Sequence, residues 1–284
     1  MNGYILAILL LQPAPTPWDS LEAPSWTRLP ERPSNNQLEC VPYREDFWSV
    51  ALIDGAVMVR ARSTSRVVEA LPFKYSPQMD QRGDRRVLQV SDGWLVGFDA
   101  GEFGGGLWWF GQDGQASRRL RPLTGAPAHA ADPFRAENVL GFTSLGGQTL
   151  VLMGLDHLSR RSGRAFGVNQ DTGGNWQLVP VAVFDGSAEA WLAEDERLYV
   201  ITEGGLWTLK SDGRVKQWPG LDLGPVGPAD SLVRATDGAL YVGLRHYVLR
   251  LEETGGVLDQ TWFAPSDCLT LRMRERCECA ARKR

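Results

Sequence analysis

Six polar residues are of types that could carry chemistry, and they fall at four well-separated places along the chain: Glu102, Asp156 with His157, Glu203, and Arg245 with His246. Two carboxylates flanking a bound sugar, such as Glu102 and Glu203, could cleave a glycosidic bond. His157 or His246 could act as a general base. The sequence contains no G-x-S-x-G, H-E-x-x-H or Walker motif. We therefore interpret the six as candidate binding residues and assign no catalytic residue.

The four cysteines lie near the two ends of the chain: Cys40, Cys268, Cys277 and Cys279. An even count is typical of an oxidising compartment. Zinc is the rival interpretation, but only Cys277 and Cys279 are clustered and no C-x-x-C pair occurs. We predict a disulfide between Cys40 and Cys268, with Cys277 or Cys279 as the alternative partner of Cys40. We predict no metal site and no cofactor.

The elements that position these residues are expected to be short strands, because turn formers and aromatic residues are frequent: 31 Gly, 17 Pro and 11 Trp. A turn followed by an apolar strand recurs five times, at intervals of 37 to 56 residues. The copies are anchored at Val59, Val96, Leu152, Val200 and Val242. An apolar run precedes each copy, so every repeat predicts at least one antiparallel hairpin.

A second hairpin signature follows the anchors, with turns at Asp113-Gly114, Gly173-Gly174, Asp212-Gly213 and Gly255-Gly256. In the first repeat, Ser63 to Gln78 is expected to form the outer hairpin without such a turn. Four antiparallel strands repeated around an axis form a β-propeller. Over residues 40 to 265 the sequence resembles bacterial β-propeller repeat proteins, a resemblance of fold only. We predict an all-β, five-bladed propeller of four-stranded blades; the alternatives are six blades and a β-sandwich.

The blade pattern divides the polar residues between two faces. The Asp-Gly turns fall on one face, where turn geometry alone accounts for them. The loops between the second and third strands fall on the opposite face, and all six candidate residues belong to these loops. The starts of the inner strands should converge there near the central channel: Glu45-Asp46, Arg85-Arg86, Asn138, Glu189 and Asp230. We therefore predict binding on the loop-rich face.

Charge and targeting signals limit the function further. The formal net charge of −4 argues against a nucleic-acid partner, and no apolar run is long enough for a transmembrane segment. The apolar run Tyr4 to Leu11 precedes a Pro-rich stretch and is typical of a secretory signal, although no Lys or Arg precedes it. We predict a signal peptide over residues 1–14, a Pro-rich segment over 15–39 and one propeller domain over 40–284. The location is then periplasmic or secreted.

The predicted function is that of a non-catalytic exported propeller that binds a protein or another macromolecule through its loop-rich face. An inhibitor or immunity-type protein is the biological form we expect. The alternative is a hydrolase or lyase that acts on glycans with rim carboxylates. A deep axial pocket holding two carboxylates would favour the alternative, whereas a shallow rim would favour protein binding.

Overall fold

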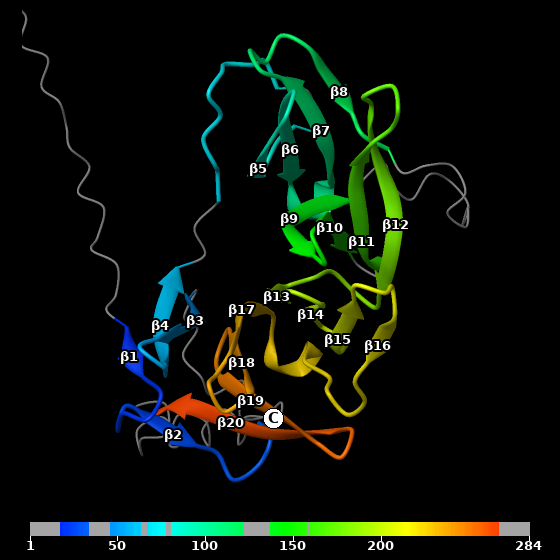
Figure 1. Ribbon diagram of the computed structural model, residues 1–284. Coiled ribbons are helices and arrows are strands. Elements are labelled where there is room, and N and C mark those ends of the chain that lie inside the picture. Colours follow the sequence, from blue (N-terminus) through cyan, green and yellow to red (C-terminus); the bar gives the residue numbers. More distant parts are fainter. Residues whose placement is uncertain are drawn as a thin grey trace, which may run out of the picture.

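The computed structural model describes residues 18–33, 46–63, 67–77, 81–121, 137–157 and 160–266. Within these ranges the regular structure is almost entirely antiparallel strand. The strands form five sheets around a common axis (Figure 1). The prediction of an all-β propeller is confirmed.

The sheets follow one another along the chain, each beginning with its innermost strand. Sheet 1 contains β3 (Asp46–Ile53), β4 (Ala56–Ser63) and β1 (Asp19–Ser20). Sheet 2 contains β5 (Asp84–Val90), β6 (Gly93–Asp99), β7 (Gly105–Gly111) and β8 (Ser117–Arg119). Sheet 3 contains β9 (Asn138–Leu145), β10 (Gln148–His157), β11 (Arg160–Gln170) and β12 (Trp176–Phe184). Sheet 4 contains β13 (Ala190–Glu194), β14 (Arg197–Thr202), β15 (Gly205–Lys210) and β16 (Val215–Gln217). Sheet 5 contains β17 (Ala229–Arg234), β18 (Leu240–Leu244), β19 (Val248–Thr254), β20 (Val257–Pro265) and β2 (Trp26–Arg28).

The hairpin turns use the residues that the sequence pattern predicts. Asp54 and Gly55 join β3 to β4 with φ values of 50° and 80°. Positive φ at both central residues defines the turn whose twist matches that of the flanking strands. Asp-Gly meets this requirement because glycine has no Cβ and aspartate tolerates the left-handed region.

Sheets 2, 3 and 4 have the four strands that the repeat pattern predicts, and the two sheets at the ends of the ring depart from this number. Sheet 1 has three strands and sheet 5 has five, because β1 pairs with β4 and β2 pairs with β20. Part of the predicted Pro-rich segment over residues 15–39 therefore joins sheet 1 to sheet 5. The chain is held there by Ser266, whose backbone amide donates to the Ser25 carbonyl at 2.7 Å.

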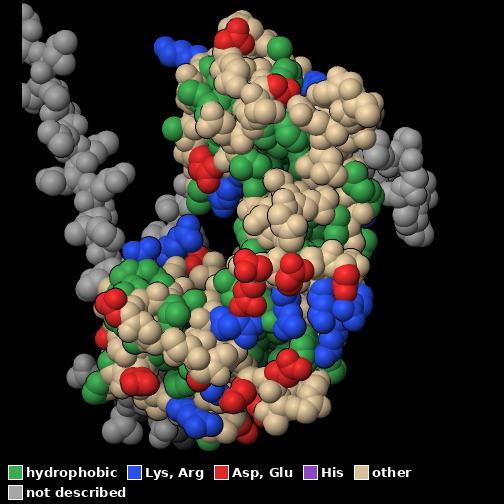
Figure 2. Space-filling view, in the orientation of Figure 1, with side chains coloured by type: hydrophobic (Ala, Val, Ile, Leu, Met, Phe, Trp, Pro, Cys, Tyr) green, Lys and Arg blue, Asp and Glu red, His purple; other side chains and the backbone are tan. Residues whose placement is uncertain are grey.

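The predicted outer hairpin over Ser63 to Gln78 is wrong. Residues 67–77 form no hairpin but run across one face of sheet 2, where Leu71, Phe73 and Tyr75 pack against an apolar cluster that includes Phe110. The Glu69 carboxylate accepts a hydrogen bond from the Val87 amide at 2.6 Å. This segment covers the face that a preceding blade would cover, and sheets 1 and 2 stand apart (Figure 1). The surface is hollowed at the same place (Figure 2).

Separate apolar clusters hold the other sheets together. Leu95 of sheet 2 and Phe166 of sheet 3 share one cluster, and Leu152 of sheet 3 and Val200 of sheet 4 share the next. Sheets 4 and 5 meet around Trp262, which is 2% exposed. Trp26 and Trp48 meet edge to face between sheets 5 and 1, with ring centroids 4.8 Å apart. Burial of this apolar area between sheets is the main stabilising term, and it fixes the inner strands around the axis.

Candidate functional site

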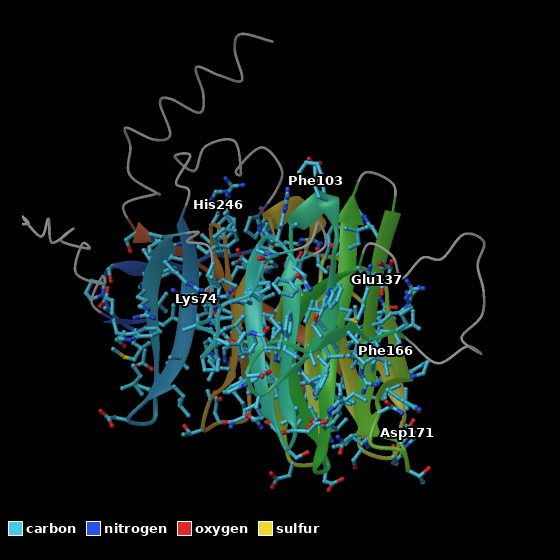
Figure 3. The ribbon with its side chains drawn as sticks, turned by 90° about the horizontal axis from the view of Figure 1, so that it is seen from above. Lys74, Phe103, Glu137, Phe166, Asp171 and His246 are labelled. Carbon is cyan, nitrogen blue, oxygen red and sulfur yellow. The ribbon has the colours of Figure 1, made fainter. Side chains whose placement is uncertain are left out.

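The two faces of the molecule are separated as the repeat pattern predicts. Phe103 and His246, from loops between second and third strands, lie at one edge of the molecule, and Asp171, from a turn between third and fourth strands, lies at the opposite edge (Figure 3). We call the edge with Phe103 and His246 the loop face and the other the turn face. The inner strands start at the loop face, so their first residues surround the axis there.

A cavity of about 680 Å³ lies at this end of the axis. Its wall includes residues of all five sheets, since the inner strands or the loops that lead into them come together there. Four of the lining residues are acidic and two are arginines: Asp84, Asp99, Glu189, Asp230, Arg62 and Arg86. The sequence pattern placed Arg86, Glu189 and Asp230 at starts of inner strands, and the structure brings them to one cavity.

Glu189 is the most strongly perturbed group of the cavity. Its Oε2 accepts a hydrogen bond from the backbone amide of Ala229 at 2.8 Å. Burial raises the pKa of Glu189 from 4.5 to about 7, and the negative charges of Asp156 and Glu203 add to the rise. A carboxyl group with such a pKa can hold or release a proton near neutral pH.

The other cavity carboxylates have structural partners. Asp230 accepts hydrogen bonds from Ser49 at 2.5 Å and from Arg62 at 3.2 Å, which joins sheet 5 to sheet 1. Asp99 accepts from the Gly101 amide at 2.8 Å, yet burial raises its pKa. These contacts hold the charges at fixed positions around the wall.

Asp156 and Glu203 lie next to this cavity, on sheets 3 and 4. The Arg161 guanidinium contacts the Glu203 carboxylate at 2.9 Å. Asp156 accepts from the Ser187 amide at 3.2 Å. Burial raises the pKa of Asp156, and the nearby charge of Glu203 acts in the same direction. The structure thus brings together two of the six candidate residues, Asp156 and Glu203. Their negative charges act on each other and on Glu189.

The remaining candidates are placed separately. Glu102 is exposed in a 3-10 turn, η1 (Gly101–Phe103), on sheet 2. Arg245 and His246 follow β18 on sheet 5, where the Arg245 amide donates to the Pro228 carbonyl at 3.2 Å. Burial and the charge of Arg245 lower the pKa of His246. His157 ends β10, and its side chain lies outside what the structure describes.

Two features of the loop face were missed by sequence reasoning. Phe103 is 84% exposed, the largest exposure among the large apolar side chains of the described residues. Its position beside Glu102 in a Gly-rich loop could have drawn attention to it. Asp99 was not predicted as a site residue because it is the last residue of an apolar strand. Only the fold shows that this end of the strand faces the axis.

The described residues offer no group of three or more His, Cys, Asp or Glu side chains that could hold a metal ion. Cys40 and Cys268 lie outside the described residues, so their predicted disulfide remains a prediction. None of the described helices is long and apolar enough to span a bilayer.

Comparison with solved structures finds distant similarities. A streptogramin B lyase structure is 14% identical to this chain, with a TM-score of 0.36. The match covers 62% of this chain and 53% of that one. The extracellular domain of BT4673 from B. thetaiotaomicron, described as a hybrid two-component system, is 10% identical over 77% of this chain and 33% of that one, with a TM-score of 0.39. Virginiamycin B lyase from Staphylococcus aureus is 9% identical over 84% of this chain and 95% of that one, with a TM-score of 0.28.

Similarities this low carry no argument about the function of the chain. The chain spans about half of the first of these structures and about a third of the second. No protein-family model matches the sequence, and no curated protein matches it. The function therefore has to be argued from the loop face itself.

Proposed function

We propose that this protein is an exported, non-catalytic β-propeller that binds a protein or another macromolecule through its loop face. The observation that carries the proposal is the exposure of Phe103, 84% of whose surface is open to solvent at the tip of η1. An aromatic side chain in this position contributes nothing to the core, whereas Phe, Tyr and Trp are enriched in the central part of protein interfaces.

The surroundings of Phe103 fit a binding rim. Glu102 is exposed beside it, and Glu203 with Arg161 supplies a half-exposed charged pair on the same face. A polar rim around an apolar anchor is the usual anatomy of a protein interface. The biological form we propose is an inhibitor or immunity-type protein, since a rigid scaffold without a catalytic motif suits the blocking of another protein.

The test of the proposed function is a comparison of the two faces. Phe103→Ala should abolish capture of a partner from the envelope fraction of the native organism, and Val257→Ala should not. Val257 is a suitable control because it is 56% exposed next to the Gly255-Gly256 turn on the turn face. Capture that survives Phe103→Ala and is lost with Val257→Ala would place the binding surface on the turn face.

Export is part of the same proposal and has its own test. Asp19 and Ser20 pair with β4, so a signal peptidase has to cut before them. We expect intact-mass analysis of periplasmic or secreted material to give a first residue between 15 and 18. An uncleaved cytoplasmic product would contradict export.

A glycan-acting hydrolase or lyase is the second candidate, and one observation favours it. Glu189, with a pKa of about 7, lines a cavity that also contains Asp230, which is the kind of setting in which a carboxyl acts as acid or base. The pair first considered, Glu102 with Glu203, is less suited because Arg161 occupies Glu203. Glycan cleavage that is lost in Glu189→Gln would establish the enzyme; binding to a partner without any cleavage would support the first proposal.

A further inference from the structure

The axial cavity has an excess of negative charge. Its wall holds four carboxyl groups and two guanidinium groups. Arg62 contacts Asp230 at 3.2 Å. Arg86 donates from Nε to the Leu140 carbonyl at 3.1 Å, its Nη1 is buried without a hydrogen-bond partner among the described residues, and its positive charge acts to lower the pKa of Asp99. The carboxylates therefore outnumber the cations that could neutralise them inside the cavity.

The charges that face Glu189 from the neighbouring sheets increase this imbalance. Asp156 on sheet 3 and Glu203 on sheet 4 both repel its ionised form. The positive charge of Arg161 acts on Asp156, but its guanidinium is paired with the Glu203 carboxylate at 2.9 Å. The Ala229 amide donates to one oxygen of Glu189 and fixes the carboxyl at the wall. A positive charge that entered the cavity would offset both the repulsion and the loss of hydration.

The rest of the wall suits an apolar stem. Phe47, Leu140 and Trp191 line the cavity from sheets 1, 3 and 4. The Trp191 ring packs directly against Gly141. A Cβ at position 141 would lie 2.4 Å from the ring, so only glycine leaves room for it. An indole beside carboxylates can contact both the methylene groups and the charged end of a cation. A volume of about 680 Å³ lies within the usual range for small-ligand sites.

We propose that the axial cavity binds an organic cation, an ammonium or guanidinium group on an apolar stem, with Glu189 as its anionic partner. The cation has two sources with this chemistry: a free amine, or a Lys or Arg side chain of the macromolecule that docks on the loop face. The second source rests on the proposed function, whereas the first does not.

The experiment uses agmatine, a guanidinium and an amine on a four-carbon stem, with butylurea as an uncharged analogue. Titration calorimetry at pH 8 should show agmatine binding to the wild type and no binding of butylurea. Glu189→Gln should weaken agmatine at least tenfold, since the amide keeps an acceptor for the Ala229 amide but carries no charge. Glu253→Gln is the matched control because Glu253 is exposed near the turn face, and it should bind as the wild type does.

A proton readout separates direct contact from an indirect effect of the substitution. Near pH 7, agmatine should displace a proton from Glu189, so the binding enthalpy should depend on the ionisation enthalpy of the buffer. This dependence should vanish in Glu189→Gln. Asp230→Asn, which removes one negative charge from the cavity wall, is the second variant if Glu189→Gln does not fold. Equal binding of butylurea, or unchanged affinity and proton release in folded Glu189→Gln, would overturn the proposal.

Two further arms distinguish the sources of the cation and the two proposals. The peptide acetyl-Gly-Arg-Gly-amide should compete with agmatine if the cavity accepts a side chain of a docked protein; agmatine binding without competition assigns the site to a free amine. Phe103→Ala should leave agmatine affinity unchanged. If the loop face binds no macromolecule, the proposal of a cation site is unaffected. If agmatine does not bind, the proposal that Phe103 contacts a macromolecular partner is unaffected.

Discussion

The Glu189 carboxylate accepts a hydrogen bond from the Ala229 amide at 2.8 Å, which links the entrances of the inner strands of sheets 4 and 5. The link places an acid in the axial cavity among other acids. Burial comes first among the causes that raise the pKa of Glu189 to about 7, ahead of the charges of Asp156 and Glu203. The Ala229 contact itself acts to lower the pKa of Glu189, so it is burial, which outweighs this contact, that makes the cavity sensitive to pH.

The first prediction concerns stability against pH. Between about pH 4.5 and 7, folded Glu189 keeps a proton that the unfolded chain has lost, so the stability of the folded state falls as pH rises through this window and levels off above it. The shift from 4.5 to about 7 corresponds to at most about 3 kcal/mol. Urea unfolding at pH 4.5 and pH 8 should show a smaller loss in Glu189→Gln than in the wild type. Identical pH slopes in the two proteins would contradict the assigned pKa.

The second prediction concerns Phe103. Phe103→Ala should change the free energy of unfolding by less than about 0.5 kcal/mol, because the side chain is exposed. It should weaken partner binding by at least about 2 kcal/mol, the threshold for an interface anchor. Melting curves and a binding titration would measure the two effects. Val257→Ala on the turn face should be neutral in both.

The third prediction compares charge reversals on the two faces. Glu102→Lys with Glu203→Lys should weaken partner binding, because like charges opposite a partner's groups cost more than a lost contact. Asp113→Lys with Asp212→Lys should leave binding intact. It should cost some stability, since these carboxylates accept hydrogen bonds from the Gln115 and Arg214 amides at 3.0 and 3.1 Å. Loss of binding only with the turn-face pair would reverse the assignment of faces.

The hairpins could be predicted from sequence because a turn between two paired strands leaves a local signal, such as Asp54-Gly55. The pairing of β1 with β4 and of β2 with β20 leaves none, since two or three residues cannot show a period and their partners lie far away in the chain. The segment containing Leu71, Phe73 and Tyr75 misled for a different reason. A hairpin was expected there because the other repeats continue with one, although this segment has no Asp-Gly turn; its apolar side chains instead pack against a sheet face.

The cavity was predictable only in part. Starts of inner strands identify Arg86, Glu189 and Asp230 once the repeat is recognised. Which of them is buried deeply enough to change its pKa depends on how closely the neighbouring sheets approach. That distance is set by side chains such as Trp191 and by glycines such as Gly141, whose contact is not encoded in either local sequence.

The fourth prediction is the disulfide between Cys40 and Cys268. Ser266 is anchored to Ser25 by a backbone hydrogen bond of 2.7 Å, so the chain beyond it starts from beside the N-terminal strands. Closing the 228-residue loop between the two cysteines would contribute roughly 5 kcal/mol on the chain-entropy model. Peptide mapping without reduction should recover a peptide linked through Cys40. A free Cys40 thiol in native protein would refute the pairing.

The fifth prediction tests the clasp formed by residues 18–33. Trp26 is 9% exposed and packs edge to face on Trp48, while its strand extends sheet 5. Trp26→Ala should lower the free energy of unfolding by about 3 to 5 kcal/mol, the cost of truncating a buried aromatic side chain. Glu22→Ala, an exposed change in the same segment, should stay within about 0.5 kcal/mol of the wild type. Urea midpoints give both values, and limited proteolysis should release the N-terminal segment earlier from Trp26→Ala. Equal midpoints for Trp26→Ala and the wild type would mean that sheets 1 and 5 are held together without the clasp, by β3 packing on β17 and β18 alone.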